Sequence, residues 1–213
     1  MQRKPFVTRC LLNTCLCSGS IFCAVPTFAE IRFSSHPIAN PVIAVAYPVR
    51  GTTRYQLQIY EQKPNGRQCW SEERGRLDSV KPLLMEFDFT GSCARYIDGN
   101  GYSIRIGDRD MATEYRPTIQ LAGANLCLMA VPTVNAKNNP KILIGIGKLG
   151  KAGKVQKITF ENSWQISRRM FLERPLGHVY IESKQSLALA SNTSTQSRDC
   201  KVWSIILWDE KHA

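Results

Sequence analysis

Apolar and polar residues alternate over short runs of this chain, and turn residues separate the runs. In the stretch 85–106, the apolar side chains of Met85, Phe87 and Phe89 alternate with polar ones, and the same period returns after an Asp-Gly-Asn-Gly segment at 98–101. A period of two places alternate side chains on opposite faces of a β-strand, and Asp-Gly and Asn-Gly favour tight turns. We therefore predict two neighbouring antiparallel strands on either side of this turn, with the three apolar residues facing the core.

Other short segments show the same kind of pattern, and no segment keeps a helical period. The clearest is RYQLQIYEQ at 54–62, which alternates strictly. Because strands of this length and spacing are typical of all-β folds, we predict an all-β domain at 42–185, an antiparallel barrel or sandwich with short helices at most. Further strands are predicted at 42–47, 118–121, 126–131, 141–146, 155–160 and 178–182.

Two parts of this domain resemble each other. Residues 95–98 and 101–104 are similar to residues 170–173 and 177–180, at an offset of 75 residues that grows to 76 at the glycine. Two β-rich pseudo-repeats within one barrel or sandwich would fit this pattern. The alternative is that similar strand-turn-strand chemistry arises twice.

The first 29 residues have the features of a secretory signal peptide. Basic residues come first, an apolar run extends from Cys10 to Val25, and the segment ends at Ala29 with small residues nearby. The apolar run is shorter than the roughly 20 residues needed to span a bilayer, so no transmembrane helix is expected. We predict cleavage after Ala29 and export to the periplasm or the extracellular space.

The charge of the exported chain points to anionic partners. The whole chain has 28 Lys and Arg against 17 Asp and Glu; removing 29 residues, three of them basic, leaves a net charge of +8 on 184 residues. Such a charge favours an anionic envelope glycan, although a basic surface that only aids solubility is the alternative. An envelope protein is a second possible partner, and nucleic acid is not expected outside the cell.

Four cysteines remain after the leader is removed: Cys69, Cys93, Cys127 and Cys200. An even number in an oxidising compartment indicates disulfides, and the absence of CxxC spacing argues against zinc. We pair Cys69 with Cys93, because each lies just outside a predicted strand with a strong turn segment between them. Closing that loop contributes about 3 kcal/mol. Cys127 is either a buried thiol or the partner of Cys200.

The segment GIGKLGKA at 145–152 matches a phosphate-binding loop up to its last position. Ala152 lacks the hydroxyl that would hold Mg²⁺, and the VQKITF that follows predicts a strand instead of the helix that such a loop needs. We therefore expect a basic hairpin, and no nucleotide or other cofactor. Its lysines are Lys141, Lys148, Lys151, Lys154 and Lys157.

Two sets of polar residues near the turn at 98–101 are candidates for function. Glu86 and Asp88 would lie about 7 Å apart on one strand face, a separation that allows a carboxylate pair for hydrolysis of an envelope polymer. Solvated carboxylates are much more common, and the chain has no G-x-S-x-G or H-E-x-x-H motif. Our preferred hypothesis is a non-enzymatic binding or structural module of the cell envelope. Its candidate binding surface comprises Trp70, Arg95, Tyr96, Asp98, Asn100 and Tyr102.

Several motifs occur together: RQCWSE at 67–72, FDFTGSC at 87–93, NGYSIR at 100–105 and LGHVY at 176–180. As a set they resemble a family of exported cyanobacterial proteins that is known only as a domain of unknown function. The resemblance covers about residues 42–182. It implies a periplasmic or extracellular setting and supports the pairing of the first two cysteines, but it implies no activity.

The segments that flank the β-domain have a different composition. Residues 30–41 contain two prolines and predict an irregular lead-in, and the Ser- and Thr-rich residues 186–199 predict a linker. The short apolar segment at 200–213 is predicted to pack on the core as a final strand, because it is too short to span a membrane.

Overall fold

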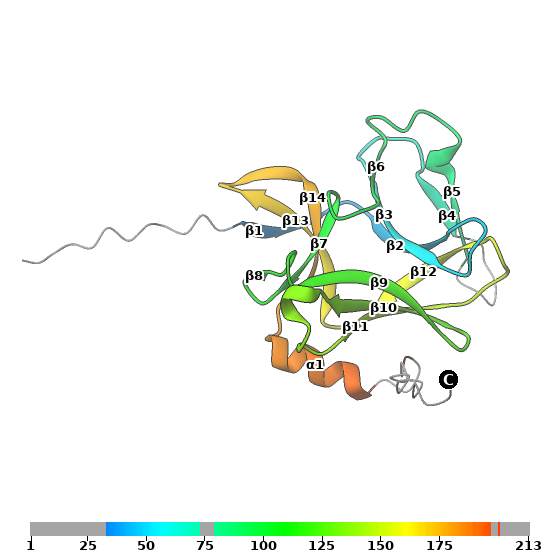
Figure 1. Cartoon of the computed structure of the whole chain (residues 1–213). Helices are drawn as coiled ribbons and strands as arrows, with labels where there is room; N and C mark the ends of the chain where they lie inside the picture. Colours follow the sequence, from blue (N-terminus) through cyan, green and yellow to red (C-terminus); the bar gives the residue numbers. More distant parts are fainter. Residues whose placement is uncertain (1–32, 73–78, 197–199, 201–213) are drawn as a thin grey trace, which may run out of the picture. The chain divides into compact units, whose positions relative to one another are not determined.

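The computed structural model describes residues 33–72, 79–196 and Cys200. Within these residues the chain forms fourteen strands, two 3₁₀ helices and one α-helix (Figure 1). The strands form two curled sheets, in which nearly all neighbouring strands are antiparallel. The prediction of an all-β fold with a barrel- or sandwich-like arrangement is confirmed.

The smaller sheet has five strands. In sheet order they are β1 (Ser34–Pro37), β13 (Trp164–Phe171), β14 (Arg174–Ser183), β7 (Tyr102–Ile106) and β8 (Arg109–Asp110). β7 and β14 run parallel, with Tyr102 opposite Val179, whereas the other pairs are antiparallel. Of the two segments that resemble each other in sequence, only the second parts lie side by side, on β7 and β14. Residues 95–96 belong to a strand of the larger sheet, whereas residues 170–171 end β13.

The larger sheet has nine strands. Seven follow one another in the order β6 (Cys93–Tyr96), β3 (Tyr55–Gln62), β2 (Val42–Pro48), β12 (Val155–Phe160), β11 (Ile142–Lys148), β10 (Asn125–Pro132) and β9 (Tyr115–Ala122). β5 (Ser79–Pro82) pairs with both β12 and β4 (Trp70–Glu72). Within the described residues, every strand predicted from alternation is present except the one at 85–90.

The main core contains side chains from both sheets. Ile104 and Ile181 of the smaller sheet belong to one cluster with Ile59, Leu128 and Ile144 of the larger sheet, and all five are completely buried. Burying a side chain of this size contributes about 1.5–3 kcal/mol. The period of two in these strands therefore has a direct cause, since every second residue faces this cluster.

A second apolar cluster covers the other face of the larger sheet, and it explains the failed strand prediction. Leu83–Met85 forms a 3₁₀ helix, and the Asp88 Oδ1 atom accepts a hydrogen bond from the Thr90 amide at 3.0 Å, which turns the chain. Phe87 and Phe89 are half-buried against this outer cluster, and Met85 is 53% exposed. The predicted hairpin of 85–90 with 102–106 is wrong, because β7 lies between β14 and β8.

Both disulfides are formed. Cys69 and Cys93 are joined, with their Cα atoms 5.9 Å apart, which confirms the predicted pairing. Cys127 and Cys200 form the second bridge at the same Cα separation, so Cys127 is not a free thiol. The first bridge holds the segment before β4 against the start of β6, and the second joins Cys200 to β10.

Regular structure also occurs in the flanking segments. β1 lies in the expected irregular lead-in, and α1 (Leu187–Gln196) lies in the expected linker. The Ser186 hydroxyl accepts a hydrogen bond from the Leu189 amide, as at a helix N-cap, and Ala190 is buried in the main core. Contact of Ala190 with the core helps to stabilise this helix, although Ser and Thr have low helical propensity. The predicted signal peptide at 1–29 and the tail 201–213 lie outside the described residues.

The glycine-rich segment at 145–152 belongs to the predicted hairpin of β11 and β12. A Cβ atom at Gly145 would lie 2.5 Å from the Thr159 carbonyl oxygen, and one at Gly147 would lie 2.4 Å from the Lys157 carbonyl oxygen. These glycines therefore allow two strands to approach closely. No helix follows them, so the arrangement lacks the N-terminus that a phosphate loop requires.

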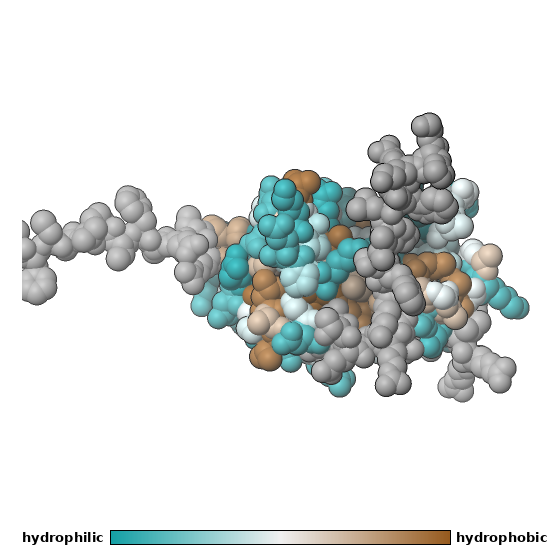
Figure 2. Space-filling model, turned by 60° about the horizontal axis from the view of Figure 1, so that its bottom comes forward, coloured by the Kyte–Doolittle hydropathy of each residue, from teal (hydrophilic) through white to brown (hydrophobic). Residues whose placement is uncertain are grey.

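Apolar residues on the surface are scattered. Large apolar side chains that are at least a third exposed lie on separate elements, and in the described part of Figure 2 apolar and hydrophilic residues are interspersed. They include Met85, Leu121, Val134, Leu172 and Leu189. Among the described residues, no helix is long and apolar enough to cross a membrane.

Candidate functional site

A cleft of about 770 Å³ is lined by residues from both sheets. The larger sheet contributes Glu61 at the end of β3 and Tyr96 on β6, and the smaller sheet contributes Arg168 on β13 and the segment 175–177 at the start of β14. The turn at 97–101 adds polar groups at the rim. Binding sites for small molecules have volumes of about 300–1,000 Å³, so this cleft has the size of a ligand site.

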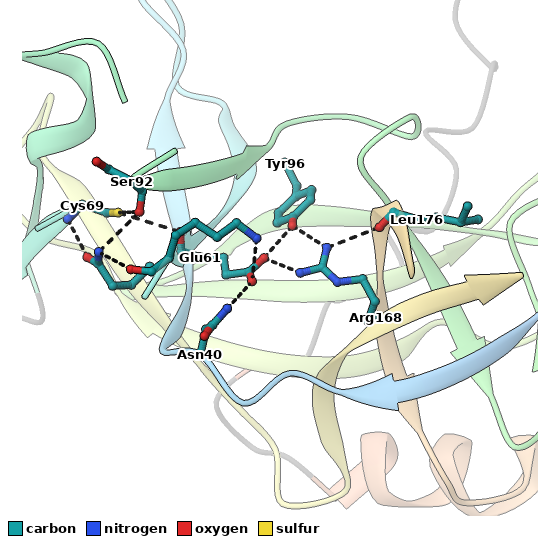
Figure 3. Close-up of polar contacts among 9 residues, drawn as sticks. Asn40, Glu61, Cys69, Ser92, Tyr96, Arg168 and Leu176 are labelled. Carbon is teal, nitrogen blue, oxygen red and sulfur yellow. Dashed lines mark hydrogen bonds and ion pairs between the residues drawn. The ribbon is translucent and has the colours of Figure 1, made fainter. Parts of the chain in front are cut away.

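The Glu61 carboxylate is the centre of a polar network in this cleft (Figure 3). Its Oε2 atom accepts hydrogen bonds from the Tyr96 hydroxyl at 2.7 Å and from Arg168 Nη2 at 2.5 Å. Its Oε1 atom accepts from Asn40 Nδ2 at 2.8 Å and from Lys63 Nζ at 2.9 Å. The side chain is only 1% exposed, so this carboxylate is buried but fully hydrogen-bonded.

The strand pattern of β3 explains why a carboxylate is buried here. Leu57 and Ile59 face the main core, and the period of two places Glu61 on the same face. Arg168 lies on β13 and reaches Glu61 across the gap between the sheets, while its Nη1 atom donates to the Tyr96 hydroxyl oxygen at 2.7 Å. The network therefore joins the two sheets at one end of the core.

The network keeps its groups in defined protonation states. Burial alone would raise the pKa of Glu61, but hydrogen bonds from Tyr96, Asn40, Lys63 and Arg168 outweigh it and lower the pKa to about 2. Burial, together with the hydrogen bond to Glu61, raises the pKa of Tyr96 to about 12. At neutral pH the site thus contains an ionised carboxylate and a neutral phenol.

Four of the six residues predicted to form a binding surface line this cleft: Arg95, Tyr96, Asp98 and Asn100. Arg95 Nη1 lies 3.0 Å from the Met85 sulfur. The Asp98 Oδ1 atom accepts a hydrogen bond from the Asn100 amide at 2.9 Å, which stabilises the turn. Both Asp98 and Asn100 are exposed.

The other two predicted binding residues lie elsewhere. Trp70 begins β4 and packs against the outer apolar cluster. Tyr102 is 6% exposed, and its hydroxyl donates a hydrogen bond to the Leu57 carbonyl oxygen at 3.1 Å, inside the fold. The sequence reasoning missed Asn40, Glu61, Lys63 and Arg168. Of these, Glu61 could have been found, because a carboxylate on the apolar face of an alternating strand is unusual.

Glu86 and Asp88 do not lie on one face of a strand. Residues 86–88 are not in a strand, so the argument from strand spacing no longer applies. Glu86 forms an exposed ion pair with Lys81 at 2.9 Å. Hydrogen bonds from Thr90 lower the pKa of Asp88, which favours an ionised turn residue over a proton donor.

Ser103 and His178 meet on neighbouring strands. The Ser103 Oγ atom lies 2.9 Å from His178 Nε2, and His178 Nδ1 lies 2.8 Å from the Asn100 carbonyl oxygen. Burial lowers the pKa of His178, so the neutral ring donates from Nδ1 to this carbonyl and accepts from Ser103. Both side chains are more than nine-tenths buried. They therefore hold the turn at the rim of the cleft against β14 and are not presented to a substrate.

Comparison with known protein families identifies the chain. A family described as protein of unknown function (DUF3747) matches residues 10–186, which is most of the sequence. The chain belongs to the DUF3747 family. This match confirms the resemblance to a family of unknown function, and it includes every residue that lines the cleft. Comparison with curated proteins and with solved structures found no match.

The side chains that line the cleft indicate which kind of ligand this DUF3747 protein could bind there. In the described part of the chain, no group of three or more His, Cys, Asp or Glu side chains is placed to hold a metal ion. The polar side chains of the cleft are three cations, Lys63, Arg95 and Arg168, with the carboxylates of Glu61 and Asp98, the amides of Asn40 and Asn100 and the Tyr96 hydroxyl. This set suits hydrogen bonding to a polar, negatively charged ligand.

Proposed function

We propose that this protein is an exported, non-enzymatic β-domain that binds an anionic glycan of the cell envelope in the cleft around Glu61. The observation that carries the proposal is the buried network of Glu61, Arg168, Tyr96, Lys63 and Asn40. Burying charged groups costs more than it returns unless the geometry is good, and apolar residues in the same place are often at least as stable. All five residues line the cleft, so this network is placed to take part in recognition as well as to stabilise the fold.

Some hydrogen-bond donors and acceptors of the cleft remain for a ligand, and together they suit a sugar acid. Lys63 is 33% exposed and uses one donor on Glu61, so further N–H groups remain for a ligand. The Arg95 guanidinium has five N–H donors, of which one points to Met85. Arginine binds carboxylates through two parallel hydrogen bonds, and the exposed Asp98 and Asn100 supply acceptors and donors for sugar hydroxyls.

A hydrolase is not favoured by the same geometry. Glycoside hydrolysis needs one carboxyl group that is protonated at working pH and a second carboxylate across the scissile bond. The low pKa of Glu61 keeps it ionised, and four donors already occupy its oxygens. Asp98 is exposed and bonded to its own turn. Binding without turnover therefore accounts for these residues more simply.

Export and an envelope setting are part of the proposal. Two disulfides are typical of oxidising compartments, and the N-terminal 29 residues have the pattern of a cleaved leader. The net positive charge of the chain favours association with anionic polymers. An envelope protein is the competing partner, and the test below includes it as an outcome.

The test is titration calorimetry of the purified, oxidised protein with polygalacturonate, with neutral dextran, with isolated envelope polysaccharide and with solubilised envelope protein. We expect binding of the acidic polymers alone and a loss of at least tenfold in affinity for Arg95→Ala. The matched control is Arg116→Ala, an exposed arginine on β9.

Three results would overturn the proposal. The acidic polymers could fail to bind at low salt, or Arg116→Ala could weaken binding as much as Arg95→Ala. Binding to envelope protein but not to envelope polysaccharide would replace the glycan with a protein partner.

A further inference from the structure

A second cleft adjoins the first. It has a volume of about 420 Å³ and is formed by the segments 39–41 and 62–66 together with Gln68. Asn40 and Lys63 line both clefts, so the two hollows meet at these residues. The total space exceeds the volume of about 300–1,000 Å³ that is typical of small-molecule sites. A ligand that fills both clefts must be longer than one small molecule.

The two clefts differ in chemistry. The first contains three cations and two carboxylates, as described above. In the second, Lys63 is the one charged residue among those that line it, and the other polar side chains are amides such as Asn65 and Gln68. Pro41 and Pro64 add apolar surface. Amides and proline rings suit a neutral, hydroxyl-rich group better than a charged one.

The wall of the second cleft is held rigidly. Gln62 Nε2 donates to the carbonyl oxygens of Lys63 and Arg67, each at 3.1 Å, and Gln62 Oε1 accepts from the Cys69 amide at 3.0 Å. At Gly66 the chain passes so close to Ser92 that a Cβ atom would lie 2.5 Å from the Ser92 Cα atom. A preformed wall lowers the entropy cost of binding, which a fluctuating loop would not do.

We propose that the two clefts are adjoining subsites of one groove that takes at least two sugar units, an acidic unit in the first cleft and a neutral unit in the second. Lys63 and Asn40 lie at the junction, where they contact the linkage between the units. This inference rests on the proposed function and specifies its ligand as a glycan with alternating acidic and neutral sugars.

The experiment compares three defined probes by titration calorimetry: glucuronic acid, a tetrasaccharide that alternates glucuronate with N-acetylglucosamine, and neutral chitotetraose. The tetrasaccharide should bind at least tenfold more tightly than glucuronic acid, well beyond the twofold that its two acidic units give by statistics. Gln68→Ala should lower the affinity for the tetrasaccharide about threefold, which corresponds to the loss of one neutral hydrogen bond. The affinity for glucuronic acid should stay unchanged. Gln165→Ala is the control, because Gln165 is an exposed glutamine on β13 outside both clefts.

The outcomes separate the two proposals. If glucuronic acid and the tetrasaccharide bind with equal affinity, or if Gln68→Ala lowers both affinities alike, the proposal of a second subsite is wrong. The proposal that the protein binds an acidic glycan would still stand. If chitotetraose binds as well as the acidic tetrasaccharide, the assignment of an acidic unit is wrong. If none of these sugars binds and the acidic polymers of the previous test also fail, the proposed function itself is overturned.

Discussion

The substitution Glu61→Gln tests the buried network most directly. It keeps the shape of the side chain but removes the charge, and it leaves the Arg168 guanidinium without its anionic partner. The folded-state pKa of Glu61 is about 2, against an ordinary value of 4.5. At 1.36 kcal/mol for each pKa unit, this difference corresponds to about 3 kcal/mol of stability. Removal of one partner from a buried ion pair has a similar measured cost.

The sign of the pH dependence follows from the lowered pKa. Because Glu61 is a stronger acid in the folded than in the unfolded chain, its ionised form stabilises the fold above about pH 4.5. That contribution is lost as the pH falls toward 2. In the Glu61→Gln variant this part of the pH dependence should be missing, so the difference in stability between wild type and variant should shrink from about 3 kcal/mol at pH 7 toward zero in acid.

Urea unfolding at pH 7, 5, 4 and 3, followed by tryptophan fluorescence, measures this difference. The control is Glu86→Gln, because the ion pair of Glu86 with Lys81 is more than half exposed on both sides. Exposed pairs contribute about 0–1 kcal/mol, so this variant should stay close to wild type. A loss below about 1 kcal/mol at pH 7 for Glu61→Gln, or a loss that does not change with pH, would refute the reasoning.

Three further predictions concern the same architecture. Replacing both Cys127 and Cys200 with serine should cost about 4 kcal/mol in the chain-entropy model, seen as a lower urea midpoint under non-reducing conditions, and no change would contradict the role of the bridge. Gly66→Ala should cost about 1–3 kcal/mol, because its Cβ atom would overlap the chain at Ser92, and an unchanged melting temperature would contradict this contact. Tyr96→Phe should cost about 1.5–3 kcal/mol at pH 7, because one donor to the buried, ionised carboxylate is lost; an unchanged stability in urea unfolding would argue against that hydrogen bond.

The fold class could be predicted because alternation reports directly on burial. In β3 the residues Leu57 and Ile59 face the core as the period of two requires. The same pattern misled at Phe87 and Phe89, which alternate with polar residues but pack on the outer cluster from a loop. Alternation shows which side chains are apolar, but a strand forms only where a neighbouring strand offers free backbone hydrogen-bonding groups. The pairing of β7 with β14, 77 residues apart in sequence, is a long-range choice that no local pattern encodes.

The candidate site was predicted only in part, for a related reason. Arg95 and Asn100 come from one continuous segment, so their crowding was visible in the sequence. Arg168 lies 107 residues from Glu61, and only the packing of the two sheets brings them together. Residues of one continuous segment can be recognised in the sequence as one wall of a cleft. Which residues form the opposite wall depends on the topology of the fold.

The parallel pairing of β7 with β14 sets the order in which the chain can be completed. As the chain enters an oxidising compartment from its N-terminus, the Cys69 to Cys93 bridge can close as soon as β6 has emerged. β7 can pair at once with β8, but its other neighbour, β14, emerges much later. A product that stops before β14 has an open strand edge, which is prone to aggregation. The bridge from Cys127 to Cys200 forms only after β14 and α1 have been made. That bridge is therefore a chemical mark of a chain that extends at least to Cys200, since no shorter fragment can carry it.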